Sequence, residues 1–225
     1  MKPFILSVLF ACFSFSVFAQ HVPELDSAES KFFVGIVVSN TSYPIMGEHK
    51  YEFFGSITPF VNINYGYKLT KRATIQLGIG YGGNEMKGGT MSRYISPDSV
   101  YDKESYQQIR AIVLPVTFKF TPFNPYKRLQ LYANASVAPV FGHIKARATE
   151  NYKGEVSTVL YDEQSMTFDL VATAGLTLNY KISKSLTGYV DAILLYKNFD
   201  FQRPPAPGRY LENKSAVIGL NYNLH

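Results

Sequence analysis

The feature that most constrains the fold of this chain is an alternation of large apolar side chains with small or polar ones. It recurs in eight stretches between residues 31 and 224. In one of them Ile57 and Ile63 fall on one face, whereas Asn62 and Asn64 fall on the other. Successive side chains of a strand point to opposite faces, so this pattern predicts strands with one apolar face. The expected strands are residues 31–39, 56–69, 73–82, 107–120, 129–144, 166–181, 186–197 and 215–224.

The connections between these strands alternate in length. Residues 40–55, 83–106, 145–165 and 198–214 form four long connections, whereas residues 70–72, 121–128 and 182–185 form three shorter ones. An even number of strands with short periplasmic turns and long extracellular loops is typical of outer-membrane barrels. The sequence therefore predicts an all-β fold, a closed eight-stranded antiparallel up-and-down transmembrane β-barrel, located in the bacterial outer membrane.

Side-chain size indicates which face of the predicted barrel meets lipid. The apolar faces carry Leu, Ile, Phe and Tyr, and the alternate faces carry Gly, Thr, Asn and a few charges. A soluble barrel would place its large apolar residues inside. Aromatic residues should also gather at the two membrane interfaces. Tyr65, Tyr67, Phe120, Tyr180 and Tyr222 lie near the short-turn ends of the strands, and Tyr81, Phe141, Phe168 and Tyr196 near the long-loop ends.

The N-terminus has the pattern of an export signal. Lys2 precedes an apolar run that ends near Ala19, which predicts a signal peptide over residues 1–19. Residues 20–30 are then a periplasmic segment and residues 31–225 the barrel. The only cysteine, Cys12, lies in a loose lipoprotein-like box, which leaves lipidation open as an alternative. Beyond the signal, no apolar run approaches the roughly 20 residues of a membrane helix, so a helical membrane protein is excluded.

Two adjoining strands also carry a resemblance to a known family. Residues 112–119 (Ile-Val-Leu-Pro-Val-Thr-Phe-Lys) contain a mid-strand proline and end in lysine. Residues 131–139 (Leu-Tyr-Ala-Asn-Ala-Ser-Val-Ala-Pro) are mostly small and end in a second proline. This hairpin resembles the small outer-membrane β-barrel domain family of Bacteroidetes-type envelopes, which includes PorT-like proteins. The resemblance implies a membrane-embedded scaffold or a secretion-associated component, and it implies no catalytic residues.

A few charged residues fall on the lumenal face of the predicted barrel. In a narrow eight-stranded interior, buried charges should pair and fill the space rather than leave a channel. The alternative is a path for protons or ions. The expected lumenal charge network consists of Asp169, Asp191, Lys119, Lys181 and Lys197.

The short-turn end of the barrel is basic, because the acidic residues lie elsewhere. This predicts either anchoring to anionic headgroups or docking of a periplasmic or envelope protein. The expected lipid partners are phospholipid and lipopolysaccharide. The formal net charge of +5 and pI near 9.1 would also suit nucleic acid, but an exported chain does not meet it. The periplasmic basic rim consists of Lys68, Lys71, Arg72, Lys127, Arg128 and Lys184.

Candidate catalytic and cofactor motifs are weak. Residues 78–83 match the dinucleotide pattern G-x-G-x-x-G, but no helix is expected after them, so the glycines should instead make room inside a narrow barrel. His143 is the best candidate base, yet Ser136 lies on the opposite face. We expect no metal site and no cofactor.

The predicted function is a non-catalytic scaffold, an assembly or secretion-associated component, or a surface-interaction protein. A small transporter and a lipid-modifying enzyme are the alternatives.

Overall fold

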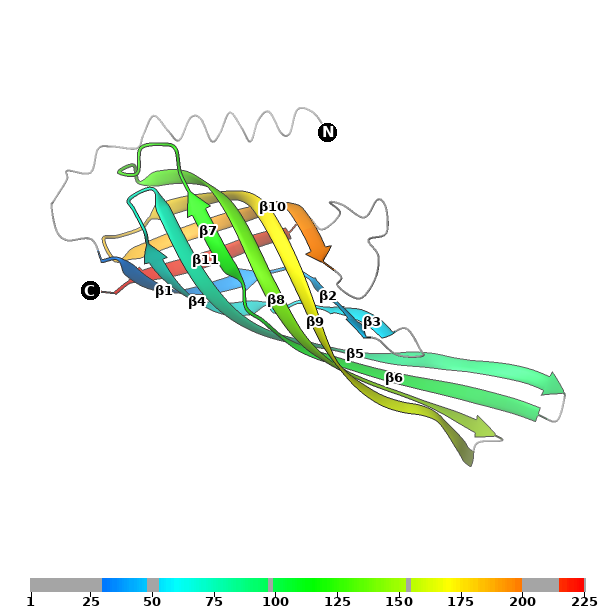
Figure 1. The fold of residues 1–225 in the computed structure, drawn as a ribbon. Coiled ribbons are helices and arrows are strands. Elements are labelled where there is room, and N and C mark those ends of the chain that lie inside the picture. Colours follow the sequence, from blue (N-terminus) through cyan, green and yellow to red (C-terminus); the bar gives the residue numbers. More distant parts are fainter. Residues whose placement is uncertain (1–29, 48–52, 97–98, 153–154, 200–214, 225) are drawn as a thin grey trace, which may run out of the picture.

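The computed structural model describes residues 30–47, 53–96, 99–152, 155–199 and 215–224. The predicted signal peptide with Cys12, residues 20–29 and most of the connection 198–214 lie outside these ranges. The described chain is built of strands (Figure 1). They are β1 (Phe32–Ser39), β2 (Tyr43–Gly47), β3 (Phe53–Ile57), β4 (Val61–Lys68), β5 (Ala73–Ser96), β6 (Ser99–Val113), β7 (Val116–Phe120), β8 (Leu129–Tyr152), β9 (Glu155–Lys181), β10 (Leu186–Phe199) and β11 (Ser215–Asn223).

The backbone pairings form a ring of eight antiparallel strand positions, which confirms the predicted fold class. β1 pairs with β11 on one side and with β4 on the other, and β4 pairs with β5. β6 and β7 together occupy the next position, between β5 and β8. They are separated at Pro115, which has no N–H for a ladder; the amide of Gly78 donates to the Pro115 carbonyl at 2.7 Å. β8, β9 and β10 complete the ring back to β11.

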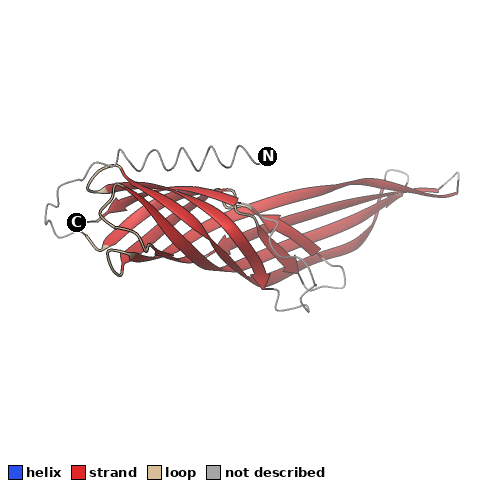
Figure 2. Cartoon of the chain, turned by 90° about the horizontal axis from the view of Figure 1, so that it is seen from above, coloured by secondary structure: helices blue, strands red, loops and turns tan. Residues whose placement is uncertain are grey.

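Four of the strands continue far beyond the ring, which makes the molecule elongated (Figures 1 and 2). β5 and β8 have 24 residues each and β9 has 27. Their distal parts, together with β6, form one four-stranded sheet, which we call the extension: residues 82–96, 99–111, 142–152 and 155–168.

Residues 83–106 and 145–165 were expected to be loops, and this expectation is wrong. In the first stretch, residues 83–88 are exposed on both faces of the extension. In the second, the inward-facing Ala146 and Ala148 are buried, but both are small. The apolar alternation that marks a half-buried strand is therefore missing there. Backbone pairing with a neighbouring hairpin builds the sheet instead.

A small hairpin, β2 with β3, occupies the concave side where the barrel meets the extension. Its Ile45 and Ile57 are buried against Ile109, Val140 and other apolar residues of the long strands. Ile57 was expected on the lipid face of a continuous strand over residues 56–69. The strand instead breaks at residues 58–60, which include a buried proline, and the part before the break belongs to the hairpin.

The facing of β10 changes along its length. A bulge between Ile193 and Leu195 inserts one residue into the ladder with β9. The bulged backbone passes so close to Gly175 that a Cβ there would lie 2.0 Å from the Ala192 carbonyl oxygen. Because side chains alternate with period two, one extra residue reverses the faces beyond it. Tyr196, expected at the lipid interface, therefore points inward, and its hydroxyl donates to the Ser42 carbonyl at 3.0 Å.

Candidate functional site

The half of the barrel interior nearer the short turns, called its lower half, holds a buried ion pair. Lys119 of β7 donates from Nζ to both carboxylate oxygens of Asp191 of β10, each at 3.1 Å. The same ammonium lies 3.8 Å from the ring centroid of Tyr189. The Tyr189 hydroxyl in turn accepts a hydrogen bond from Asn64 at 3.3 Å. The two charges are therefore held across the lumen by a specific set of polar partners.

The structure places the other three predicted lumenal charges elsewhere. Asp169 is buried but lies higher in the barrel, opposite Val140 in the β8–β9 ladder. Lys181 is half-buried at the short-turn end, where its amide donates to the Arg128 carbonyl. Lys197 is exposed, with its amine 4.7 Å from the Phe199 ring centroid. The β10 bulge explains this last difference, because it turns Lys197 to the outer face.

Little space remains inside the barrel. A hollow of about 70 Å³ lies above the ion pair, between residues of β1, β4, β8 and β10, and the volume of about two water molecules would fill it. Above the hollow, the hairpin and the apolar cluster around Val140 close the mouth. Burial raises the pKa of Tyr43 of the hairpin to about 12, so this hydroxyl stays neutral. The described interior is a packed core, with polar residues below and apolar ones above.

The predicted basic rim lies around the short turns, and some of its members contact the rim itself. Lys71 donates to the Tyr126 hydroxyl at 2.7 Å. Arg128 donates to the carbonyls of Lys181 and Ile182 and lies over the Tyr180 ring. Lys68 is half-buried. The three remaining members, Arg72, Lys127 and Lys184, are exposed, and no hydrogen bond or ion pair joins their side chains to another described residue.

The candidate catalytic residues do not assemble within the described part of the chain. His143 lies on the outer face of β8, whereas Ser136 points inward and accepts a hydrogen bond from Thr117 at 3.0 Å. The glycines of the G-x-G-x-x-G stretch lie within β5, and a Cβ on Gly78 would meet Asn64 and Pro115. No metal-binding cluster of His, Cys, Asp or Glu occurs among the described residues. The same part of the chain contains no helix long and apolar enough to cross a membrane.

The extension adds a feature that the sequence did not predict, two lateral edges without a neighbouring strand. β5 pairs with β4 only as far as Gly80, and β9 pairs with β10 only as far as Leu170. Beyond these points each strand has a partner on one side only, within the described sheet. Natural proteins normally shorten or cover such edges because an unpaired edge can accept another strand.

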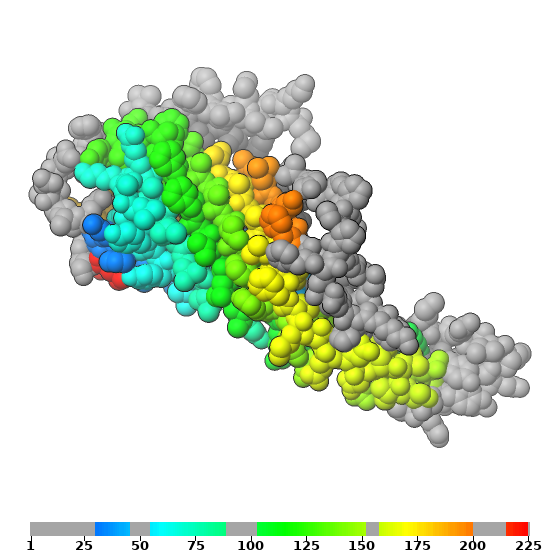
Figure 3. All heavy atoms as spheres, viewed as in Figure 1, coloured from blue at the N-terminus to red at the C-terminus, as the bar shows by residue number. Residues whose placement is uncertain are grey.

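The outer surface of the ring has the band expected of a membrane barrel. Large apolar side chains are exposed around the whole ring, and Ile36, Ile63 and Ile218 are each more than 60% accessible. Figure 3 shows one side of this surface, where β4, β5, β7, β8 and β9 follow one another as diagonal bands. A soluble protein does not expose an apolar surface of this extent, and in lipid a closed barrel satisfies its backbone polar groups. The chain is an outer-membrane β-barrel protein. The band includes Leu77, Ile79, Phe118, Leu131, Leu176, Val190 and Leu220.

Comparisons with known proteins found distant structural likenesses and no family. No protein-family model matches the chain, and no curated protein matches it significantly. Similar solved structures include Ail, the attachment invasion locus protein of Yersinia pestis, at 12% identity and a TM-score of 0.41, covering 86% of this chain and 98% of that one. Neisserial surface protein A is similar at 12% identity and a TM-score of 0.35, covering 86% and 97%. These values are too low to transfer an activity or a partner.

Proposed function

We propose that this outer-membrane protein is a non-catalytic surface-interaction protein, and that the free edge of β9 binds an extended segment of a partner protein. The observation that carries the proposal is the extension itself. Its strands continue the strands of the barrel, so its edge projects from one end of the barrel. Addition of a strand to an exposed edge is a common mode of peptide recognition, in which main-chain hydrogen bonds supply affinity.

The direction of the backbone groups along this edge follows from the ladder. The Lys181 amide donates to the Arg128 carbonyl of the segment leading into β8. In an antiparallel sheet, the backbone N–H and C=O groups of successive residues point alternately to the neighbouring strand on one side and on the other. The β8–β9 register is continuous from Tyr180 down to Tyr161, so odd-numbered residues such as Ser165 face β8. The N–H and C=O groups of Gln164 and Asp162 therefore face the free edge.

Side chains along the same edge support occupation by another strand. Val159 and Leu160 are 48% and 40% exposed, although they lie in a strand. Gln164 and Asp162 are also exposed. An added strand would pair with the free backbone groups and cover part of this apolar surface. Edge pairing supplies affinity, and the alternating side chains supply selectivity.

The experiment replaces one edge amide without removing a ladder hydrogen bond. Gln164→Pro deletes an N–H that faces the free edge, whereas Gln164→Ala keeps it and serves as the matched control. Partner crosslinking is measured in intact cells with a photoreactive residue at Asp162. We expect the adduct to be lost in the proline variant and kept in the alanine variant, with both barrels folded. Equal adducts in both variants would contradict edge binding.

A second candidate is docking at the periplasmic rim, which the resemblance to PorT-like proteins would connect with assembly or secretion. The exposed Arg72, Lys127 and Lys184 favour it, because their side chains contact no other described residue through a hydrogen bond or ion pair. The transporter alternative is disfavoured by the packed interior, and the lipid-modifying enzyme by the separation of His143 from Ser136.

A further inference from the structure

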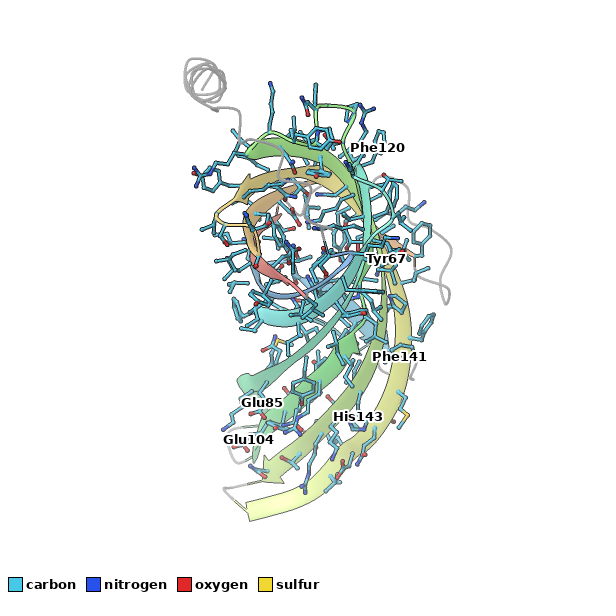
Figure 4. The ribbon with its side chains drawn as sticks, turned by 90° about the vertical axis from the view of Figure 1, so that its left-hand side faces the viewer. Tyr67, Glu85, Glu104, Phe120, Phe141 and His143 are labelled. Carbon is cyan, nitrogen blue, oxygen red and sulfur yellow. The ribbon has the colours of Figure 1, made fainter. Side chains whose placement is uncertain are left out.

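The outer face of the extension begins with a row of apolar and aromatic side chains that continues the lipid-facing band. Tyr81, Ile112, Phe141 and Phe168 lie side by side on β5, β6, β8 and β9, and all are exposed. Figure 4 labels Phe141 and His143, which lie two positions apart on β8. Residues two positions further along a strand lie roughly 7 Å away on the same face. The next row should therefore lie at the level where the lipid headgroups begin.

That next row consists of Gly83, Arg110, His143 and Met166. Met166 is 86% exposed. A methionine this accessible on an outward face is best explained if the membrane surface reaches the row. Arg110 and His143 are direct cross-strand neighbours in the same row, so both lie at headgroup depth.

A third basic residue lies immediately above this pair. Lys145 follows His143 on the same face of β8 and is exposed. We call Arg110, His143 and Lys145 the outer basic patch. No hydrogen bond or ion pair joins the side chains of the patch to another described residue. The acids closest to the patch in the ladder are Glu85, which accepts a hydrogen bond from Gln108 in the row of Lys145, and Asp162, which lies opposite Arg147 one row higher.

The surface beside the patch is hollowed. Because Gly83 has no side chain, the flank of Arg110 is open, and a hollow of about 450 Å³ lies between Tyr81, Gly83, Glu85 and Arg110. The Tyr81 ring lies at its lower end, and Glu85, Gln108 and Arg110 line its upper part, where Arg110 is the basic group. A ligand that fits this arrangement has an apolar part below and an anionic group above.

We propose that the outer basic patch binds the phosphate groups of the phosphorylated glycolipid that forms the outer leaflet. Three observations select a lipid over a soluble anion. The patch lies on the outer face of the extension, the same face that carries the lipid-facing band on the barrel. It follows the apolar row on the same strands without a gap, and an exposed methionine shares its row. Guanidinium and ammonium groups bind phosphate oxygens through charge-assisted hydrogen bonds, and the imidazole ring adds a further donor.

The test measures binding of lipid A to the full-length protein in neutral detergent micelles at low salt. The probes are bisphosphorylated lipid A, the same lipid A after removal of both phosphates, and inorganic phosphate. The patch variant carries Arg110→Gln, His143→Gln and Lys145→Gln. The charge-matched control carries Lys87→Gln and Lys103→Gln, two exposed lysines of the extension outside the patch. A heat-dependent shift in gel mobility verifies that each variant is folded.

We expect the patch variant to bind bisphosphorylated lipid A about 25-fold more weakly than the wild type, since each Lys or Arg near an anionic surface contributes roughly a factor of five. The control should stay within about twofold. Equal affinity of the patch variant and the wild type would overturn the proposal, as would undiminished binding of the dephosphorylated lipid. Competition by inorganic phosphate at the same concentration as the lipid would show a soluble-anion site and would also overturn it.

Discussion

The ion pair inside the barrel should behave as a unit, and a double-mutant cycle can measure this. The side chains of Lys119 and Asp191 are only 4% and 11% exposed. Removing one partner leaves the other charge buried without compensation, which costs about 3–5 kcal/mol. Lys119→Met should therefore lower the free energy of unfolding by that amount. It also removes the ammonium from the face of Tyr189.

Replacing both charges should restore most of the stability. In the double variant Lys119→Met, Asp191→Leu, apolar side chains of similar volume occupy the same space, and such replacements are often neutral. We expect it to lie within about 2 kcal/mol of the wild type, the remaining loss being the desolvated cation–π contact. The free energies come from reversible urea unfolding in lipid vesicles. The exposed Lys127→Met is the control and should change stability by less than about 0.5 kcal/mol.

The reasoning is refuted if the double variant loses the sum of the two single losses. It is also refuted if Lys119→Met is as harmless as the surface control. Either result would mean that the charges do not compensate each other in the folded barrel.

Three further predictions concern the hairpin, the lumen and the rim. Ile45→Ala should cost about 2–5 kcal/mol in urea unfolding because Ile45 is fully buried, whereas Ile63→Ala on the lipid face should cost less. Planar-bilayer recordings should show no stable single-channel steps, and steps that change with Asp191→Asn would favour the transporter alternative. Reversing Lys71, Arg72, Lys127 and Arg128 to Glu should weaken affinity for anionic bilayers by roughly 1 kcal/mol per residue, an effect that salt masks. Loss of a specific crosslink with unchanged lipid affinity would instead support a periplasmic partner.

The number of barrel strands and their facing could be predicted because lipid imposes a strict alternation. Ile63, Leu77 and Leu176 point outward as expected, and Asn64 and Thr177 point inward. The extension could not be predicted in the same way. Glu85 and Lys87 lie on one face of β5 and Asn84 on the other, and all three are exposed. A strand with water on both faces has no periodic signal, so it looks like a loop in the sequence.

Two other differences depend on local backbone events that leave a weak trace in sequence. The bulge near Leu194 reverses the facing of Tyr196 and Lys197, and the only hint of it is an irregular run of apolar residues. Ile57 keeps the parity of the following strand but belongs to the hairpin. Among the candidate site residues, the structure pairs Lys119 with Asp191. The outer basic patch was missed because Arg110 and Lys145 were assigned to a strand end and a loop.

The most direct test of the central claim, that the extension projects from the outer face of the membrane, is labelling of single cysteines in intact cells. In a Cys12→Ser background, Gln164→Cys lies in the extension and Lys184→Cys lies in a short turn, and both side chains are exposed. A membrane-impermeant maleimide should label Gln164→Cys in intact cells, and it should label Lys184→Cys only after the outer membrane is permeabilised. Labelling of Lys184→Cys but not Gln164→Cys in intact cells would contradict the account.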